Sequence, residues 1–334
     1  MPSRYMILGG LREDYCITHT NQAFLGVIGG NAAYAAAGAA VWSSSVGIVS
    51  RIGSNYPRPW LAQIQAAGIR TDAIRILPDN QDTRTFYKYL SLQERVDTNP
   101  ATYFLQARLP LPMALADYRS STEGQDNQEE FGPLALRPSD LPASLESTAG
   151  AHLAPGNYLT HSILPTRLRE LGVRLITVDP SIRYMQPHFR HKLRILVNSL
   201  SAFLPSEAEA RSFFQPRPPG LWEMAEEFAS FGCPIVLLKR GAAGQYLLDH
   251  NARRRWHIPA SPARVVDVTG AGDAYCGGFL VGLEQTGDPV EASLRGNVSA
   301  SLAVEGHGPL HALGAAPGLA EARLATLRTA VRLH

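Results

Sequence analysis

The sequence contains few cysteines and few charged residues. Its three cysteines, Cys16, Cys233 and Cys276, stand far apart, and no pair has the short spacing of a zinc site. We therefore expect free thiols in a reducing compartment. Charged residues make up 18% of the 334 residues, against about 25% in an average domain, and the formal net charge is only +2. Because no strongly basic segment stands out, we expect no nucleic-acid partner.

Long hydrophobic runs are absent as well. No stretch of 18 or more apolar residues occurs, so the sequence predicts no membrane-spanning helix. The first ten residues, MPSRYMILGG, lack the extended apolar segment of a signal peptide. These features predict a soluble, cytoplasmic protein without a membrane partner. The length suits one large α/β domain, and we interpret residues 1–334 as a single domain.

Two common nucleotide-binding fingerprints are missing. No G-x-x-x-x-G-K-[ST] occurs, which argues against a Walker-type phosphate loop. The stretch GAGDAY begins like G-x-G-x-x-G but lacks the last glycine. A dinucleotide oxidoreductase is therefore the weakest of the functions that we considered.

The apolar segments that are present follow an alternation of strands and helices. Gly172–Asp179, Leu193–Asn198 and Pro234–Gly241 each predict a buried central strand, with helical segments between some of them. This rhythm predicts a doubly wound, mostly parallel sheet flanked by helices.

Two segments break this alternation. Thr83–Phe104 is aromatic, β-branched and interrupted by turns, which is typical of hairpin strands. We expect a small separate sheet from about residues 10–28 and 83–112. Residues 116–142 are polar, acidic and rich in proline, and they predict a surface excursion.

The stretch VVDVTGAGDAYCGGF, Val265–Phe279, is the most informative part of the chain. It reads as a strand, a glycine-rich turn and the start of a helix. Bare backbone N–H groups at a helix N-terminus form an anion site, and glycine lets a phosphate approach them closely. Asp273 falls in the first helical turn, where it is either a helix cap or a base that accepts a proton from an attacking hydroxyl.

This stretch resembles the C-terminal signature of the PfkB/ribokinase family of carbohydrate and nucleoside kinases. GGNAAYAAAGAAVWSSSVGIVSRIGSN resembles the N-terminal signature of the family, and VDPSIR, LPSEAEA and LLKRGAAGQYLL resemble motifs between the two. The resemblance implies a ribokinase-like fold with a small β-sheet lid. It also implies phosphoryl transfer from ATP to a sugar or nucleoside hydroxyl. By resemblance, Asp273 is the catalytic base, and Gly270, Ala271 and Gly272 supply the anion-hole amides.

The resemblance also assigns the acceptor end of the site. Asp14, after the first strand, would accept hydrogen bonds from substrate hydroxyls, and Gly30 and Asn31 match the glycine pair and a substrate-contacting position. Tyr34 is a departure, because many sugar kinases of the family have asparagine there. It predicts either an altered acceptor site or a side chain that only fills core space.

The remaining assignments concern the nucleotide and metal ions. Glu209 would organise Mg²⁺ through water, although Ser206 replaces the asparagine of that motif. His307 is expected to be structural. The residues near the nucleotide are Lys239, Gly241, Gly244 and Asn297, and a monovalent cation such as K⁺ would bind near Asp267, Thr269 and Gly308.

Two further expectations concern partners and activity. The family often pairs its lids, so we expect a homodimer through the small sheet. The departures at Tyr34 and Ser206 keep an alternative open, namely a binding protein that retains the fold without turnover.

Overall fold

The computed structural model describes residues 3–333, which form one large sheet and one small sheet. The large sheet is parallel from β11 to β5, and β12, β13 and β14 extend it in antiparallel fashion. The predicted doubly wound, mostly parallel sheet is thereby confirmed. Its strands are, in spatial order, β14 (Arg332–Leu333), β13 (Arg254–Ile258), β12 (Gln245–Asp249), β11 (Ile235–Lys239), β10 (Ala202–Phe203), β9 (Leu175–Val178), β8 (Gly150–Leu153), β1 (Tyr5–Leu8), β4 (Val46–Ile52) and β5 (Arg70–Ile76).

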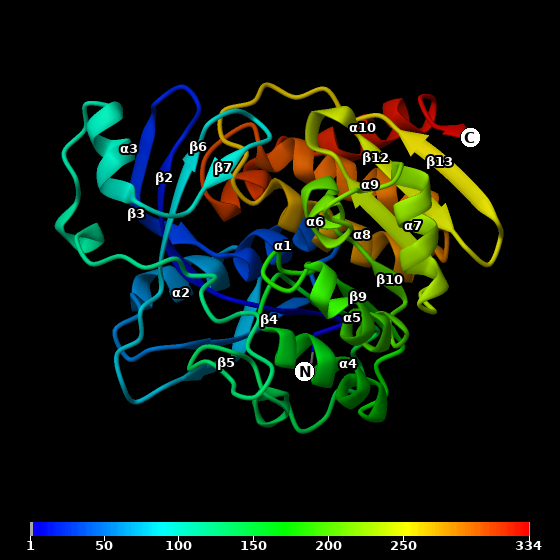
Figure 1. Cartoon of the computed structure of the whole chain (residues 1–334), viewed down its shortest axis with the longest axis horizontal. Coiled ribbons are helices and arrows are strands. Elements are labelled where there is room, and N and C mark those ends of the chain that lie inside the picture. The colour runs from blue at the N-terminus through cyan, green and yellow to red at the C-terminus, as the bar shows by residue number, and fades with distance from the viewer. Residues whose placement is uncertain (1–2, 334) are drawn as a thin grey trace.

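Alternate side chains of the central strands enter two separate cores. In β1, Met6 and Leu8 pack with helices α4, α5 and α7, whereas Tyr5 and Ile7 pack with α1 and α8. The sheet therefore lies between two helical layers (Figure 1). The helices are α1 (Asn31–Ala40), α2 (Arg58–Ala66), α3 (Pro100–Gln106), α4 (Tyr158–Glu170), α5 (Arg190–Val197), α6 (Glu207–Phe213), α7 (Leu221–Ser230), α8 (Ala271–Thr286), α9 (Pro289–Ala303) and α10 (Leu319–Arg328). Within residues 3–333, no helix has the length and apolarity that a bilayer crossing requires.

Two predicted strands were wrong. The strand expected before the glycine-rich turn is absent, because residues 263–268 form an irregular segment that leads to α8. Leu193–Asn198 falls in α5, where Leu193, Leu196 and Val197 are buried. These positions follow the i, i+3, i+4 spacing of one helix face, which a short apolar run does not distinguish from a strand.

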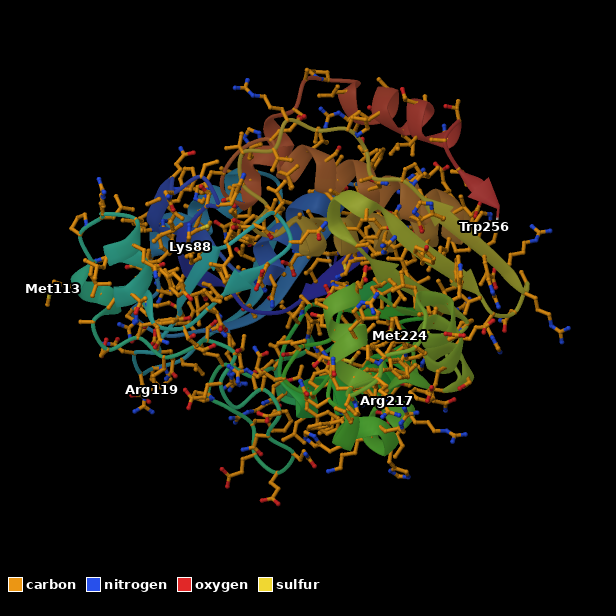
Figure 2. The ribbon with its side chains drawn as sticks, turned by 45° about the horizontal axis from the view of Figure 1, so that its top comes forward. Lys88, Met113, Arg119, Arg217, Met224 and Trp256 are labelled. Carbon is orange, nitrogen blue, oxygen red and sulfur yellow. The ribbon has the colours of Figure 1, made fainter. Side chains whose placement is uncertain are left out.

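The small sheet stands at one end of the molecule, beside the large one (Figure 1). It has the order β3 (Ala23–Gly29), β2 (Arg12–Ile17), β6 (Arg84–Tyr89) and β7 (Arg95–Val96). The predicted hairpin exists as the antiparallel pair β6–β7, but α3 takes up the end of the predicted segment. Met113, at the outer edge of this end of the molecule, is 86% exposed (Figure 2).

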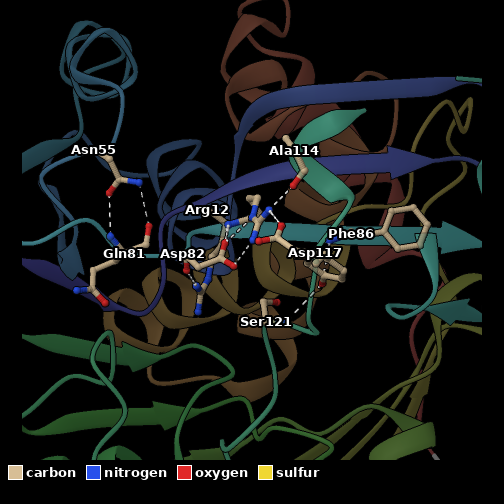
Figure 3. Close-up of polar contacts among 10 residues, drawn as sticks. Arg12, Asn55, Gln81, Asp82, Phe86, Ala114, Asp117 and Ser121 are labelled. Carbon is tan, nitrogen blue, oxygen red and sulfur yellow. Dashed lines mark hydrogen bonds and ion pairs between the residues drawn. The ribbon is translucent and has the colours of Figure 1, made fainter. Parts of the chain in front are cut away.

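Side-chain contacts tie the small sheet to the rest of the chain (Figure 3). Arg84 of β6 donates to the Asp117 carboxylate at 2.7 Å and to the Ala114 carbonyl. Asn55 and the backbone of Gln81 exchange two hydrogen bonds, of 3.1 and 2.9 Å. The strand β6 is thus held at its start by the loop after β4 and by the segment after α3.

The polar excursion lies against the large domain through ion pairs and hydrogen bonds. Asp140 is buried and pairs with Arg51 at 2.9 Å and with Arg75 at 3.2 Å. Thr122 accepts a hydrogen bond of 2.8 Å from Arg183. Two cavities, of about 420 and 550 Å³, open beside Arg183, and neither is lined by a residue predicted for the site.

Helices α1 and α8 pack with their backbones in direct contact. A Cβ atom placed on Gly277 would lie 1.8 Å from the Ala35 carbonyl oxygen, and one on Gly38 would lie 2.1 Å from the Ala274 carbonyl oxygen. The alanines of α1, buried on every face, permit the same approach. This contact sets the separation between the start of α1 and the start of α8.

Replacing Gly277 with alanine should destabilise the protein by about 1–3 kcal/mol, because the two helices must separate to admit one methyl group. Urea unfolding followed by circular dichroism measures the change. Gly132→Ala is the matched control, since a Cβ there meets nothing within 4 Å. Equal stability of the two variants would contradict the close packing of α1 on α8.

Candidate active site

The carboxyl ends of the parallel strands bring polar side chains to one edge of the large sheet. Asp179 follows β9, and Lys239 is the last residue of β11. The Lys239 ammonium donates to the Asp179 carboxylate, and this carboxylate raises the pKa of Lys239 against the opposing effect of burial. Ligands of open α/β sheets bind at this edge.

The N-terminus of α8 meets the same edge. Gly270, with φ of 73°, precedes the helix, and a Cβ on Gly272 would lie 3.6 Å from Lys239 Nζ. The Gly272 N–H has no acceptor among residues 3–333, whereas the Ala271 N–H already donates to the Val268 carbonyl at 3.2 Å. The Asp179 carboxylate compensates the charge of Lys239, but the open helix N-terminus keeps its partial positive charge, which favours an anion bound beside the lysine. The arrangement therefore suits a phosphate group.

Asp273 lies in the first turn of α8, within this charged region. Burial raises its pKa to about 6, although the positive charges of Lys239 and Arg95 act in the opposite direction. The carboxylate is consequently ionised near pH 7 but basic enough to accept a proton.

Arg95 brings a second positive charge from the small sheet. Its guanidinium carbon lies 4.4 Å from the centre of the Tyr87 ring, and its charge acts on Asp273. Asp179 lies in the family-like stretch VDPSIR, but it was assigned no role from the sequence, and no motif pointed to Arg95. The roles of both residues depend on contacts between distant parts of the chain.

At the acceptor end, Asp14 is 2% exposed, and its Oδ1 has no hydrogen-bond partner among the described residues. Burial raises its pKa to about 7, against the effects of the Gly30 backbone and of Arg12. Gly29 is required beside it, since a Cβ there would lie 1.9 Å from Asp14 Oδ2. An unpaired carboxylate oxygen at this depth suits a ligand that carries hydroxyl donors.

The predicted residues of α1 take different positions. Asn31 accepts from the Gly10 N–H at 2.8 Å and donates to the Pro155 carbonyl at 2.5 Å, so its amide bridges two strand ends. The ring of Tyr34 backs onto Gly270, where a Cβ would lie 2.0 Å from the ring. The Tyr34 hydroxyl is buried without a partner among residues 3–333. Tyr34 thus connects the acceptor end to the glycine-rich loop.

Of the residues predicted near the nucleotide, Lys239 lies beside the first turn of the helix that carries Asp273, whereas Asn297 bonds to another segment. Gly241 and Gly244 form a turn directly after Lys239, with φ of 55° and 81°. The Asn297 amide accepts from the Ser261 N–H at 2.8 Å and donates to the Pro259 carbonyl at 2.7 Å. Asn297 therefore fixes the segment between β13 and α8.

The predicted metal residues already have protein partners. Glu209 Oε2 accepts from the Ser206 N–H at 2.7 Å, and Ser206 Oγ accepts from the Glu209 N–H at 3.2 Å, which makes a capping box. Among residues 3–333, no three His, Cys, Asp or Glu side chains are grouped as direct metal ligands. Contact with Mg²⁺ through water, as expected from the sequence, remains a prediction.

Of the residues predicted to hold a monovalent cation, Asp267 and Thr269 belong to a buried hydrogen-bond network, and Gly308 adjoins it. Asp267 Oδ1 accepts from Thr269 N–H at 2.9 Å and from Thr269 Oγ1 at 2.7 Å. Its Oδ2 accepts from His307 Nδ1 at 2.6 Å, next to Gly308. Burial acts to raise the pKa of Asp267, but these hydrogen bonds outweigh it and hold the pKa below its usual value.

Comparison with known proteins finds similarity to the PfkB kinases. Residues 166–314 match the model of the pfkB family carbohydrate kinases. A cytidine kinase of Thermococcus kodakarensis is 26% identical over 269 residues, which cover 80% of this chain and 84% of that protein. These matches confirm the resemblance to the PfkB family drawn from the two glycine-rich signatures, and they confirm the predicted enzyme class, a kinase.

Solved structures agree on the PfkB-type fold. A nucleoside kinase of Burkholderia thailandensis in complex with inosine has a TM-score of 0.67 at 18% identity, covering 97% of this chain and 98% of that one. A putative ribokinase II of E. coli in complex with ATP and Mg²⁺ has a TM-score of 0.68 at 19% identity and covers 98% of each chain. The predicted ribokinase-like fold is confirmed.

Proposed function

We propose that the protein transfers the γ-phosphoryl group of ATP to a hydroxyl of a small sugar or nucleoside, with Asp273 as the general base. One observation carries the proposal: the Asp273 carboxylate lies beside the open N-terminus of α8 and the Lys239 ammonium. A base close to an anion site is what phosphoryl transfer to an alcohol requires. A helix cap alone needs no lysine at that helix end.

The phosphate end of the site combines a backbone donor with two side-chain cations. The Gly272 N–H is free to donate to a phosphate oxygen, and Lys239 lies next to it. Gly270 gives the loop its left-handed conformation, and Arg95 adds charge from the small sheet. Charge that builds up on the transferred group would be stabilised by donors already in place.

The acceptor end supports a substrate with neighbouring hydroxyls. Asp14 offers an unpaired carboxylate oxygen, and the Tyr34 hydroxyl offers a donor and an acceptor between Asp14 and the glycine-rich loop. A ribose diol satisfies both. The named activities of the cytidine kinase and the nucleoside kinase favour a riboside over a free sugar.

We also propose that Mg²⁺ accompanies ATP. Asp179 keeps one buried carboxylate oxygen without a partner among the described residues, and Glu209 acts electrostatically on the same region. These oxygens fit a hydrated Mg²⁺ held through water, which would neutralise phosphate charge. The backbone oxygens near Asp267, Thr269 and Gly308 stay our candidates for a K⁺ ion.

The small sheet is proposed to act as a lid that excludes water from the phosphoryl group. It supplies both Asp14 and Arg95, so its position decides whether the site is complete. A homodimer through this sheet stays a prediction.

Phosphorylation of a panel of ribosides, free sugars and vitamin-B6 alcohols with Mg²⁺, K⁺ and ATP tests the proposal. We expect turnover with at least one riboside, measured as ADP release and as phosphorylated product by mass spectrometry. Calorimetric binding of nucleotide and acceptor without any transfer would support the alternative of a non-catalytic binding protein.

A further inference from the structure

Two contacts join the small sheet to the loop that carries the anion site. The Phe24 ring of β3 stacks on the His307 ring, with centroids 3.5 Å apart and planes within 7°. Cys16 Sγ of β2 lies 3.5 Å from Thr269 Oγ1. The two strands of the small sheet therefore touch opposite ends of one short network.

That network leads directly to the glycine-rich loop. His307 donates to one oxygen of Asp267 at 2.6 Å, and the other oxygen accepts two hydrogen bonds from Thr269. Thr269 precedes Gly270, the N-cap residue of α8. Asp267 is 3% exposed and Thr269 is 4% exposed, so water does not readily replace these contacts. A displacement of His307 would therefore displace Asp267 and, through it, Thr269, which lies just before the anion site.

We propose that Phe24 and His307 are positioning residues that make phosphoryl transfer depend on the position of the small sheet. When the sheet lies against the large domain, the Phe24 ring holds His307, and His307 holds Asp267 and the loop up to Gly270. When the sheet moves away, the stack and the contact between Cys16 and Thr269 are both lost, and the loop loses its support from the small sheet. The acceptor, which binds to Asp14 on the same sheet, thereby controls the anion site. The inference rests on the proposed kinase activity.

The geometry of the stack between Phe24 and His307 fits a contact that is either made or lost. The attraction between two parallel rings falls steeply with their separation, so a displacement of about 1 Å removes much of it. Neither ring belongs to the rigid sheet core, because Phe24 lies on an edge strand and His307 in a loop after α9. A purely structural pair would not need to join the small sheet to the phosphate loop.

The kinetic test compares substitutions on both sides of the stack. Phe24→Ala should lower kcat by about 2- to 10-fold, the range expected for loss of one stacked pair, and Phe24→Tyr should restore it. The calorimetric Kd for ATP should stay within about 2-fold of wild type. The ratio of ATP hydrolysed to acceptor phosphorylated should rise, because water enters an imperfectly closed site. Leu25→Ala, on the neighbouring exposed position of β3, should match wild type.

A second measurement does not depend on activity. In the ligand-free protein, Phe24→Ala and His307→Ala should each speed amide hydrogen exchange in residues 266–272, and the double variant should exchange no faster than either. Strand β8 serves as the internal control for global stability. Unchanged exchange in residues 266–272, or additive effects in the double variant, would overturn the inference. Absence of phosphoryl transfer in the wild type would instead refute the proposed function.

Discussion

Replacing Asp273 with asparagine should lower kcat by at least about 100-fold, the lower end of what a general base contributes. Asparagine keeps the size of the side chain but does not accept a proton from the attacking hydroxyl. The anion site does not depend on this carboxylate, so ATP binding should persist. Steady-state kinetics together with calorimetry of ATP binding separate the two effects. Glu284→Gln, near the other end of α8, is the matched control and should retain full activity.

The pH dependence of the wild type gives a second check on Asp273. Its pKa is raised to about 6, and only the ionised form is a base. At saturating ATP and acceptor, kcat should therefore fall as the pH decreases through 6, with a slope approaching one on a logarithmic plot, and it should be level above about pH 7. Residual activity of Asp273→Asn should lack this transition. A wild-type rate that stays level down to pH 4 would mean that another group accepts the proton.

The sequence predicted the parts of the site that depend on one short, continuous segment of the chain. A glycine-rich turn followed by an aspartate in the first turn of a helix has few explanations, and the start of α8 at Ala271 agrees with the prediction. The alternation of apolar segments likewise predicted a parallel sheet, and with it a site at the strand ends. The short run at Leu193 was assigned to the wrong element, and the segment before the glycine-rich turn forms no strand.

Contacts between distant residues could not be predicted in this way. Nothing in the sequence links Asp179 to Lys239, or Phe24 to His307, because each pair meets only after the sheet and helices pack. The same limit affected Asn31 and Asn297. Both are amides at positions where the family resemblance implies ligand contacts, yet both bond to backbone groups of this chain.

The ion pair between Lys239 and Asp179 leads to the second large effect that we expect. Replacing Lys239 with methionine should destabilise the protein by about 3–5 kcal/mol, because it leaves a buried carboxylate without its counter-charge. The Asp179 side chain is only 4% exposed and the Lys239 side chain 12%, so water compensates little. Urea unfolding at pH 7 measures the loss.

The double variant Asp179→Asn, Lys239→Met separates the structural role of Lys239 from its proposed role at the phosphate. Removing both charges eliminates the uncompensated carboxylate, so most of the lost stability should return. Affinity for ATP measured without Mg²⁺, where the proposed metal contact of Asp179 plays no part, should not return, since the cation beside Gly272 is still missing. Recovery of both properties would mean that Lys239 serves only Asp179, and the anion site would then depend on the helix N-terminus and Arg95. Recovery of stability alone would show that the chain accepts a buried ion pair because the lysine is also needed for the nucleotide.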